Sequence, residues 1–198
     1  MESEREEAVF QAAMHLAEQG RWRSCSPADV AALAGIDSLD PELGDRMAIL
    51  RSFARAIDRT VSERATGAID DADVPVREKL LELLLLRFEA LVPYRSGVAA
   101  LLRGLPVNPD QAARGLPFLA RSMRQSLEQC GINVSGLRGT ARIGALGLIF
   151  LDAARVWAND TSDDLAATTR HLDERLRRAE NLELRLARPN WCGRQTSG

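Results

Sequence analysis

The sequence predicts an all-α protein of about nine helices, and three observations lead to this expectation. Apolar residues recur at three- and four-residue spacing in most segments. Capping residues, prolines and glycines stand where helices begin and end, and no segment shows sustained β-branched alternation. The expected helices cover about residues 4–19, 27–34, 41–44, 47–66, 75–92, 94–103, 109–130, 135–158 and 163–187.

Local signals define the first four helices. Gly20 and Gly35 end the first and second helices. Ser26 precedes a proline and begins the second helix as an N-cap, and Asp40 does the same for a very short third helix. The apolar spacing then predicts a long fourth helix over 47–66.

The later helices have equally clear boundaries. Pro93 ends the fifth helix, and Ser135 opens the eighth. Pro117 lies inside the seventh helix, where its missing N–H predicts a bend. The polar run 159–164 is a strong start signal for the last helix. We therefore divide the chain into an N-terminal domain of short helices (1–46), a helical bundle (47–187) and a flexible tail (188–198); the resemblance described below implies that the first is a helix-turn-helix domain and the second the ligand-binding and dimerisation bundle.

The composition excludes several classes of protein. With 45% hydrophobic and 27% charged residues the chain is typical of a globular protein, and its net charge of -2 gives no overall basic surface. Three cysteines and two histidines without metal-ligand spacing indicate no metal site, and no catalytic constellation or cofactor motif is present. We expect no enzyme activity, no cofactor and no stable membrane insertion. The acidic N-terminus and the lack of a long apolar run indicate a cytoplasmic protein.

Residues 26–36 carry the most informative motif. They read Ser-Pro-Ala-Asp-Val-Ala-Ala-Leu-Ala-Gly-Ile, in which Ala31 and Ala34 allow two helices to cross closely and Gly35 supplies the turn. Followed by a long helix and a helical bundle, this helix-turn-helix pattern resembles the TetR family of bacterial transcriptional regulators over nearly the whole chain. Short segments in the second half, such as 156–165, are similar to a subset of that family.

The resemblance implies a homodimer that binds operator DNA and is released by a small apolar effector. Ser26 and Arg46 match positions at which the family contacts phosphate. The DNA-binding residues that we expect are Arg23, Ser26, Ser38, Leu39 and Arg46. The third helix departs from the pattern, because it is about two residues shorter and lacks the usual aromatic side chains. Residues 1–64 also carry eight basic residues against twelve acidic ones, a net charge of -4, which opposes phosphate binding.

The same resemblance implies a ligand pocket and a dimer interface in the second half. We expect the pocket to be lined by Phe88, Tyr94, Phe118, Met123, Phe150 and Trp157, with Arg121 as an anionic anchor. The eighth and ninth helices are expected to form the dimer interface through small and apolar residues. These residues are Gly144, Gly147, Leu151, Leu165, Leu172 and Leu176.

Two other functions remain open. A ubiquinone-biosynthesis accessory family shares the TetR fold, has an N-terminus that does not read DNA and binds isoprenoid lipid in its bundle. The short acidic third helix and the segment 91–95 are similar to that family. A third possibility is a protein that acts only by binding another protein through its acidic N-terminal part.

Overall fold

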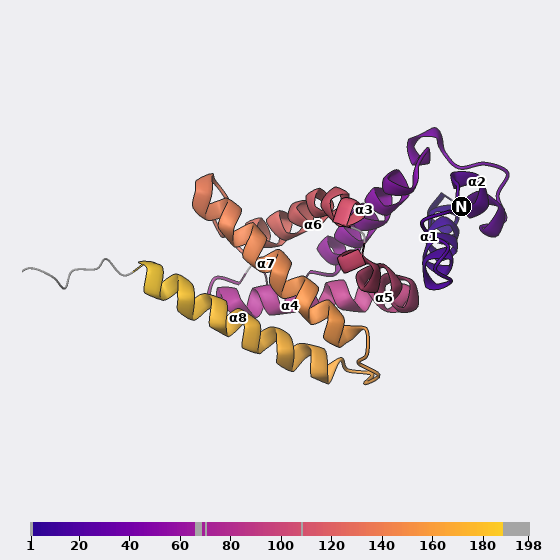
Figure 1. The fold of residues 1–198 in the computed structure, drawn as a ribbon. Coiled ribbons are helices and arrows are strands. Elements are labelled where there is room, and N and C mark those ends of the chain that lie inside the picture. The colour runs from indigo at the N-terminus through magenta and orange to yellow at the C-terminus, as the bar shows by residue number, and fades with distance from the viewer. Residues whose placement is uncertain (1, 66–68, 70, 108, 188–198) are drawn as a thin grey trace, which may run out of the picture.

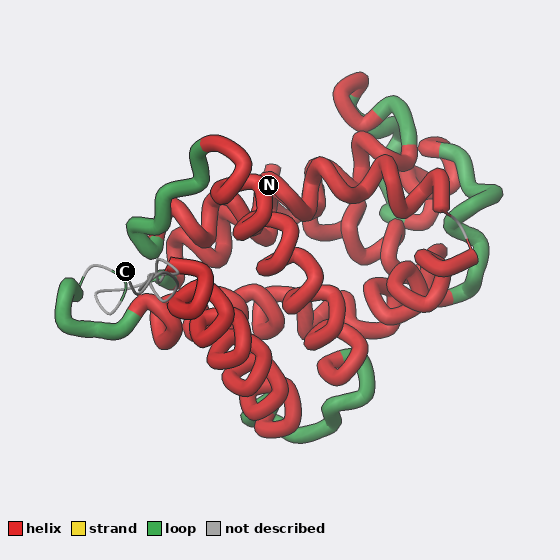
Figure 2. The backbone as a smooth tube through the Cα atoms, turned by 60° about the vertical axis from the view of Figure 1, so that its left-hand side comes forward, coloured by secondary structure: helices red, strands yellow, loops and turns green. Residues whose placement is uncertain are grey.

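The computed structural model describes residues 2–65, 69, 71–107 and 109–187, and in these residues the chain forms helices and loops without a strand (Figure 2). The all-α prediction is confirmed, but the described residues form eight α-helices rather than nine, and the expected third helix is one 3-10 turn. The tail 188–198 lies outside the described residues. The elements are α1 (Glu2–Glu18), α2 (Pro27–Leu33), η1 (Pro41–Leu43), α3 (Arg46–Arg64), α4 (Val76–Leu91), η2 (Val92–Tyr94), α5 (Arg95–Gly104), η3 (Leu105–Val107), α6 (Pro109–Gln129), α7 (Gly136–Trp157) and α8 (Ala166–Ala187).

The N-terminal head, consisting of α1, α2 and η1, lies at one end of the molecule, and α3 leads from it into the bundle formed by α4 to α8 (Figure 1). Gly35 follows α2 with a φ of +69°, the left-handed conformation that glycine adopts without strain. The turn signal read from the sequence therefore has the expected geometry. Three residues are too few for a full α-helical turn, which is why η1 closes with 3-10 hydrogen bonding.

The head packs directly on the bundle through α1 and α5. A Cβ placed on Gly97 of α5 would lie 2.4 Å from the Met14 carbonyl oxygen, so the two helices meet at backbone distance. The Tyr94 hydroxyl donates a hydrogen bond of 2.6 Å to Glu7. Phe53 of α3 stacks edge-on between Phe10 and Tyr94, with ring centroids 5.3 and 4.9 Å away. Head and bundle consequently share one hydrophobic core.

A buried ion pair joins α3 to α4 in this core. The Arg87 guanidinium lies 2.7 Å from a carboxylate oxygen of Asp58, and both side chains are less than a tenth exposed. Ser122 of α6 donates a 3.0 Å hydrogen bond to the other oxygen. Because two buried charges are stable only when paired, this cluster fixes the connecting helix α3 relative to two helices of the bundle.

The helices α7 and α8 pack against each other along the side of the bundle remote from the head (Figure 1). Asp152 of α7 lies 2.8 Å from both His171 and Arg175 of α8. Arg142 donates to Glu183 further along the same pair of helices. These contacts lie within one chain, so the two helices are already partners without a second copy. No helix in the described part of the chain has the length and hydropathy needed to cross a membrane.

Candidate functional site

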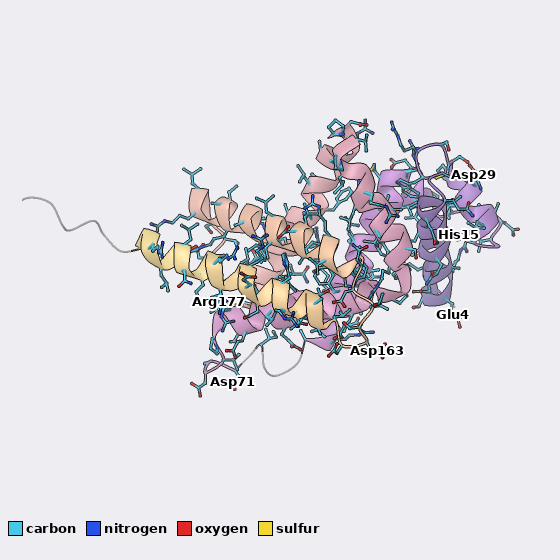
Figure 3. The ribbon with its side chains drawn as sticks, turned by 60° about the horizontal axis from the view of Figure 1, so that its bottom comes forward. Glu4, His15, Asp29, Asp71, Asp163 and Arg177 are labelled. Atoms are coloured by element: carbon cyan, nitrogen blue, oxygen red, sulfur yellow. The ribbon has the colours of Figure 1, made fainter. Side chains whose placement is uncertain are left out.

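Ser26 lies at the exposed start of α2, the short helix of the head that carries Asp29 (Figure 3), and here the resemblance predicted a phosphate contact. Its Oγ accepts from the Asp29 N–H (3.2 Å) and donates to the Asp29 carboxylate (2.8 Å), and its backbone N–H donates to the same carboxylate (2.7 Å). The backbone hydrogen bond from Ser26, followed by that of its hydroxyl, lowers the pKa of Asp29 below its ordinary value. The donors of Ser26 are thus already satisfied by an anion that belongs to the chain.

Arg46 opens α3 and is only partly exposed. Its guanidinium donates a 3.1 Å hydrogen bond to the carbonyl of Trp22, whose side chain is buried in the core of the head. Arg46 therefore ties the connecting helix to the loop before α2. Arg23 stands exposed in that loop beside Trp22.

The region expected to read DNA is short, acidic and partly apolar. Asp40 caps η1 by accepting from the Glu42 N–H at 3.0 Å. Ser38 is exposed and Leu39 is half-buried. A groove of about 350 Å³ separates α2 from this turn. It is lined by Pro27, Ala28, Ala31, Ala32, Ile36, Asp37, Ser38, Leu39, Asp40, Pro41, Leu43 and Gly44. A reading helix is absent from this surface, since residues 41–43 form only a single turn.

Most of the expected pocket residues lie in the closed core of the bundle. Phe88 stacks on Phe150 with ring centroids 5.0 Å apart and lies 5.5 Å from the Trp157 ring. Phe88, Met123 and Trp157 are fully buried, so they fill space in this structure. Tyr94 belongs to the junction with the head. The side chain of Arg121 is exposed. The charged group that contacts the aromatic cluster is instead Arg95, whose guanidinium lies over the Trp157 ring, 5.0 Å from its centroid.

Phe118, the remaining predicted pocket residue, instead lines a cleft of about 580 Å³ between the start of α3 and the first half of α6. The Arg51 guanidinium lies over the Phe118 ring, 5.4 Å from its centroid. Arg51 and Arg114 were not predicted as site residues. The position of each arginine in its own helix does not indicate a binding site, because the cleft forms only where α3 and α6 pack side by side.

The dimer residues divide between two faces. Gly144 is exposed and Leu151 is half-buried, so both remain available for an interface. Gly147 is not available for an interface. A Cβ at this position would lie 3.6 Å from Leu119 of α6, so this face of α7 is covered by the same chain. Leu165, Leu172 and Leu176, the other expected dimer residues, are likewise buried within the chain. Their spacing is explained by packing of α8 on α7 and α4.

The arrangement of the elements defines the fold. A head of two α-helices and a 3-10 turn, joined by one long helix to a helical bundle whose last two helices pair, is the TetR-like fold. A solved structure described as the TetR transcriptional regulator from Nitrosomonas europaea ATCC 19718 matches with a TM-score of 0.61 and 18% identity, covering 88% of this chain and 97% of that one. A putative TetR-family regulator from Mesorhizobium loti MAFF303099 matches with a TM-score of 0.50 and 14% identity, covering 91% and 96%. Neither a protein-family model nor a curated protein sequence matches the chain. At these identities the likeness establishes the fold alone.

Proposed function

We propose that the protein is a dimeric transcriptional regulator of the TetR type, with a head that binds operator DNA and a bundle that responds to a ligand. The observation that carries the proposal is the junction between the two parts. The close contact at Gly97 and the buried Asp58–Arg87 pair connect the head rigidly to the bundle. Two regulators with solved structures have the same fold over nearly their whole length.

DNA binding in this proposal relies on few contacts. Arg23 and Arg46 supply positive charge at the start of α2 and α3, whereas the acids of the head oppose a phosphate backbone. Ser38 and Leu39 are the side chains nearest to a base-reading position. We therefore expect weak affinity with a steep dependence on salt.

The second copy is proposed to pack on the outer face of α7. Leu137, Ala141, Gly144, Leu148 and Leu151 follow each other at four- and three-residue spacing along this helix. Leu137 and Leu148 are 91% and 71% exposed, values far above those of ordinary leucines in a folded chain. An apolar stripe of this kind is typical of a helix-helix interface, and a two-fold axis would pair it with itself.

The effector is proposed to enter the aromatic region of the bundle. The Trp157 indole N–H is buried and has no acceptor among the described residues, which costs about 1–3 kcal/mol. An apolar compound with one acceptor atom would relieve this cost if Phe88 and Phe150 moved apart. Its binding weakens DNA binding only by its differential affinity for the two states of the dimer.

The deciding experiment selects DNA fragments with the purified protein and measures binding as a function of salt. Replacing Arg46 with Gln should lower affinity for all sequences alike and reduce the salt slope by about one, the effect of one lost phosphate contact. Arg55→Gln, an exposed change further along α3, is the matched control. The proposal fails if no fragment is enriched over random DNA at low salt.

A second candidate function is lipid binding without DNA recognition, as in TetR-fold accessory proteins of ubiquinone biosynthesis. The observation that favours it is the reduced third helix with acids at positions 37, 40 and 42. Mass spectrometry of an organic extract of the purified protein tests this function. A long isoprenoid or acyl chain without any DNA binding would support it, and an empty protein that binds DNA would exclude it.

A further inference from the structure

The cleft between α3 and α6 is separate from the aromatic core of the bundle and from the groove in the head. The two helices lie beside each other where α3 leaves the head (Figure 1). The cleft measures about 580 Å³, which falls within the usual range of small-molecule sites. It is lined by Asp45, Arg46, Met47, Arg51, Arg114, Pro117 and Phe118.

Positive charge dominates the cleft. Three of its side chains are guanidiniums, and its one carboxylate, Asp45, is already engaged as the N-cap of α3. Asp45 accepts from the N–H groups of Met47 and Ala48 at 2.7 and 2.9 Å. Arg51 and Arg114 make no ion pair or hydrogen bond with any residue in the described part of the chain. Two guanidiniums on opposite walls are thus left with unused donors.

The pKa of Asp45 reflects the same arrangement of charges. Hydrogen bonding from the Ala48 N–H lowers this pKa most, against the effect of desolvation. The N–H of Met47 and the charges of Arg51 and Arg114 lower it further. Both guanidiniums therefore act on the same region at the start of α3.

The rest of the lining is apolar. Met47 belongs to α3, and Pro117 and Phe118 belong to α6. Arg51 lies over the Phe118 ring at 5.4 Å, a cation–π contact that holds the guanidinium plane near the aromatic face. The cleft combines a cationic rim with an apolar floor. Water can hydrogen-bond to the guanidiniums of the rim, but it gains nothing from contact with the apolar floor.

We propose that this cleft binds a small organic anion, with its carboxylate, sulfonate or phosphate group between Arg51 and Arg114 and its flat apolar body against Pro117 and Phe118. Guanidinium forks bind such groups through paired, charge-assisted hydrogen bonds. The apolar body displaces water from the ring and from Met47. A neutral compound cannot form the charge-assisted hydrogen bonds to the guanidiniums, and inorganic phosphate has no apolar body to cover Phe118 and Met47.

The position of the cleft gives the anion a regulatory consequence, a step that rests on the proposed DNA-binding function. Arg46 lines the cleft and is also an expected phosphate contact. An anion bound there neutralises charge beside the DNA-facing surface and competes for Arg46. Saturating anion should therefore lower DNA affinity, and DNA should lower anion affinity by the same factor.

Calorimetric titration of the full chain with 1-naphthalenesulfonate tests the site. The wild type should bind this probe at least about tenfold more tightly than it binds inorganic phosphate or 1-naphthalenemethanol. Arg114→Ala and Arg51→Ala should each weaken the sulfonate by about tenfold or more. Arg55→Ala, exposed on α3 but outside the cleft, should leave it unchanged, with thermal unfolding showing that all variants are folded.

The outcomes distinguish this inference from the proposed function. Absence of sulfonate binding in the wild type, or equal binding by the Arg51, Arg114 and Arg55 variants, overturns the assignment of the cleft. Sulfonate binding by a protein that selects no DNA leaves the site standing and removes the proposed function. DNA affinity that is unchanged at saturating sulfonate overturns the regulatory step alone.

Discussion

Replacing Gly97 with alanine tests the contact that joins the head to the bundle. The added Cβ would lie 2.4 Å from the Met14 carbonyl oxygen and 2.6 Å from the Met14 Cβ, whereas real Cβ atoms essentially never approach closer than 3.0 Å. Reaching an ordinary van der Waals distance requires α1 and α5 to separate locally by roughly 1 Å. Neither atom can rotate away, because both are fixed by the main chain of α1.

The expected cost combines two opposing effects. Overpacking a core contact costs about 1–3 kcal/mol, and the gain in helix propensity from glycine to alanine returns about 0.5–1 kcal/mol. We expect a net loss of about 1 kcal/mol, which for a chain of this size lowers the melting temperature by roughly 2–4 °C.

The matched control is Gly115→Ala in α6, where a Cβ meets nothing within 4 Å. This substitution has the same gain in helix propensity without a clash between the new Cβ and a neighbouring helix, so it should raise the melting temperature slightly. A cycle of Gly97→Ala with Met14→Ala sharpens the test. Alanine keeps the Cβ and the carbonyl oxygen of Met14, so the coupling energy should stay below about 0.5 kcal/mol. A Gly97→Ala protein that melts at or above the wild-type temperature would refute the geometry of this contact.

Three further predictions concern the bundle. Burial opposes ionisation of Asp160, but hydrogen bonds from Ser162 and Thr168 outweigh it and hold the pKa of Asp160 far below its usual range. Asp160→Asn should therefore cost about 2 kcal/mol at pH 7. Thermal melts should show this difference shrinking as the pH falls below about 4, because the unfolded wild-type chain then takes up a proton at this carboxyl while the folded chain still holds it ionised. Arg87→Met leaves a buried carboxylate without its cation and should cost about 3–5 kcal/mol in urea unfolding, and adding Asp58→Leu should restore much of that loss. Leu148→Glu should convert the dimer to a folded monomer in light scattering at micromolar concentration, and a wild type that is already monomeric would contradict the interface.

The helix boundaries were predictable where a local signal determines them. Ser26 and Gly35 act through hydrogen bonds and backbone angles within a few residues, and the structure has both features as expected. The third helix was predicted with the right position and the wrong type. Asp40 and Asp45 both act as N-caps, so only four residues separate them, and this spacing leaves room for a 3-10 turn but not for an α-helix.

The residues of the candidate sites were harder to predict, because they depend on contacts between distant helices. In the sequence, Arg51 is one of several arginines spaced along the fourth expected helix, and no local pattern indicates its partner. Its contact with Phe118 joins residues that are far apart in the sequence and follows only from the packing of α3 on α6. Arg87 likewise lies in an apolar stretch whose periodicity gives no indication of its partner, Asp58.

The burial of Gly147 has a specific physical cause. The helix α7 carries two apolar stripes with the same spacing, one through Ile143 and Leu146 and the other through Gly144 and Leu148. A small residue in either stripe allows a close approach, but the spacing does not say whether the approaching helix belongs to the same chain. The packing of α6 decides this, since Leu119 covers Gly147 and leaves Leu148 in solvent. A helix that is apolar on two opposite faces can bury only one of them against its own bundle, so the outer stripe is where a second copy is to be sought.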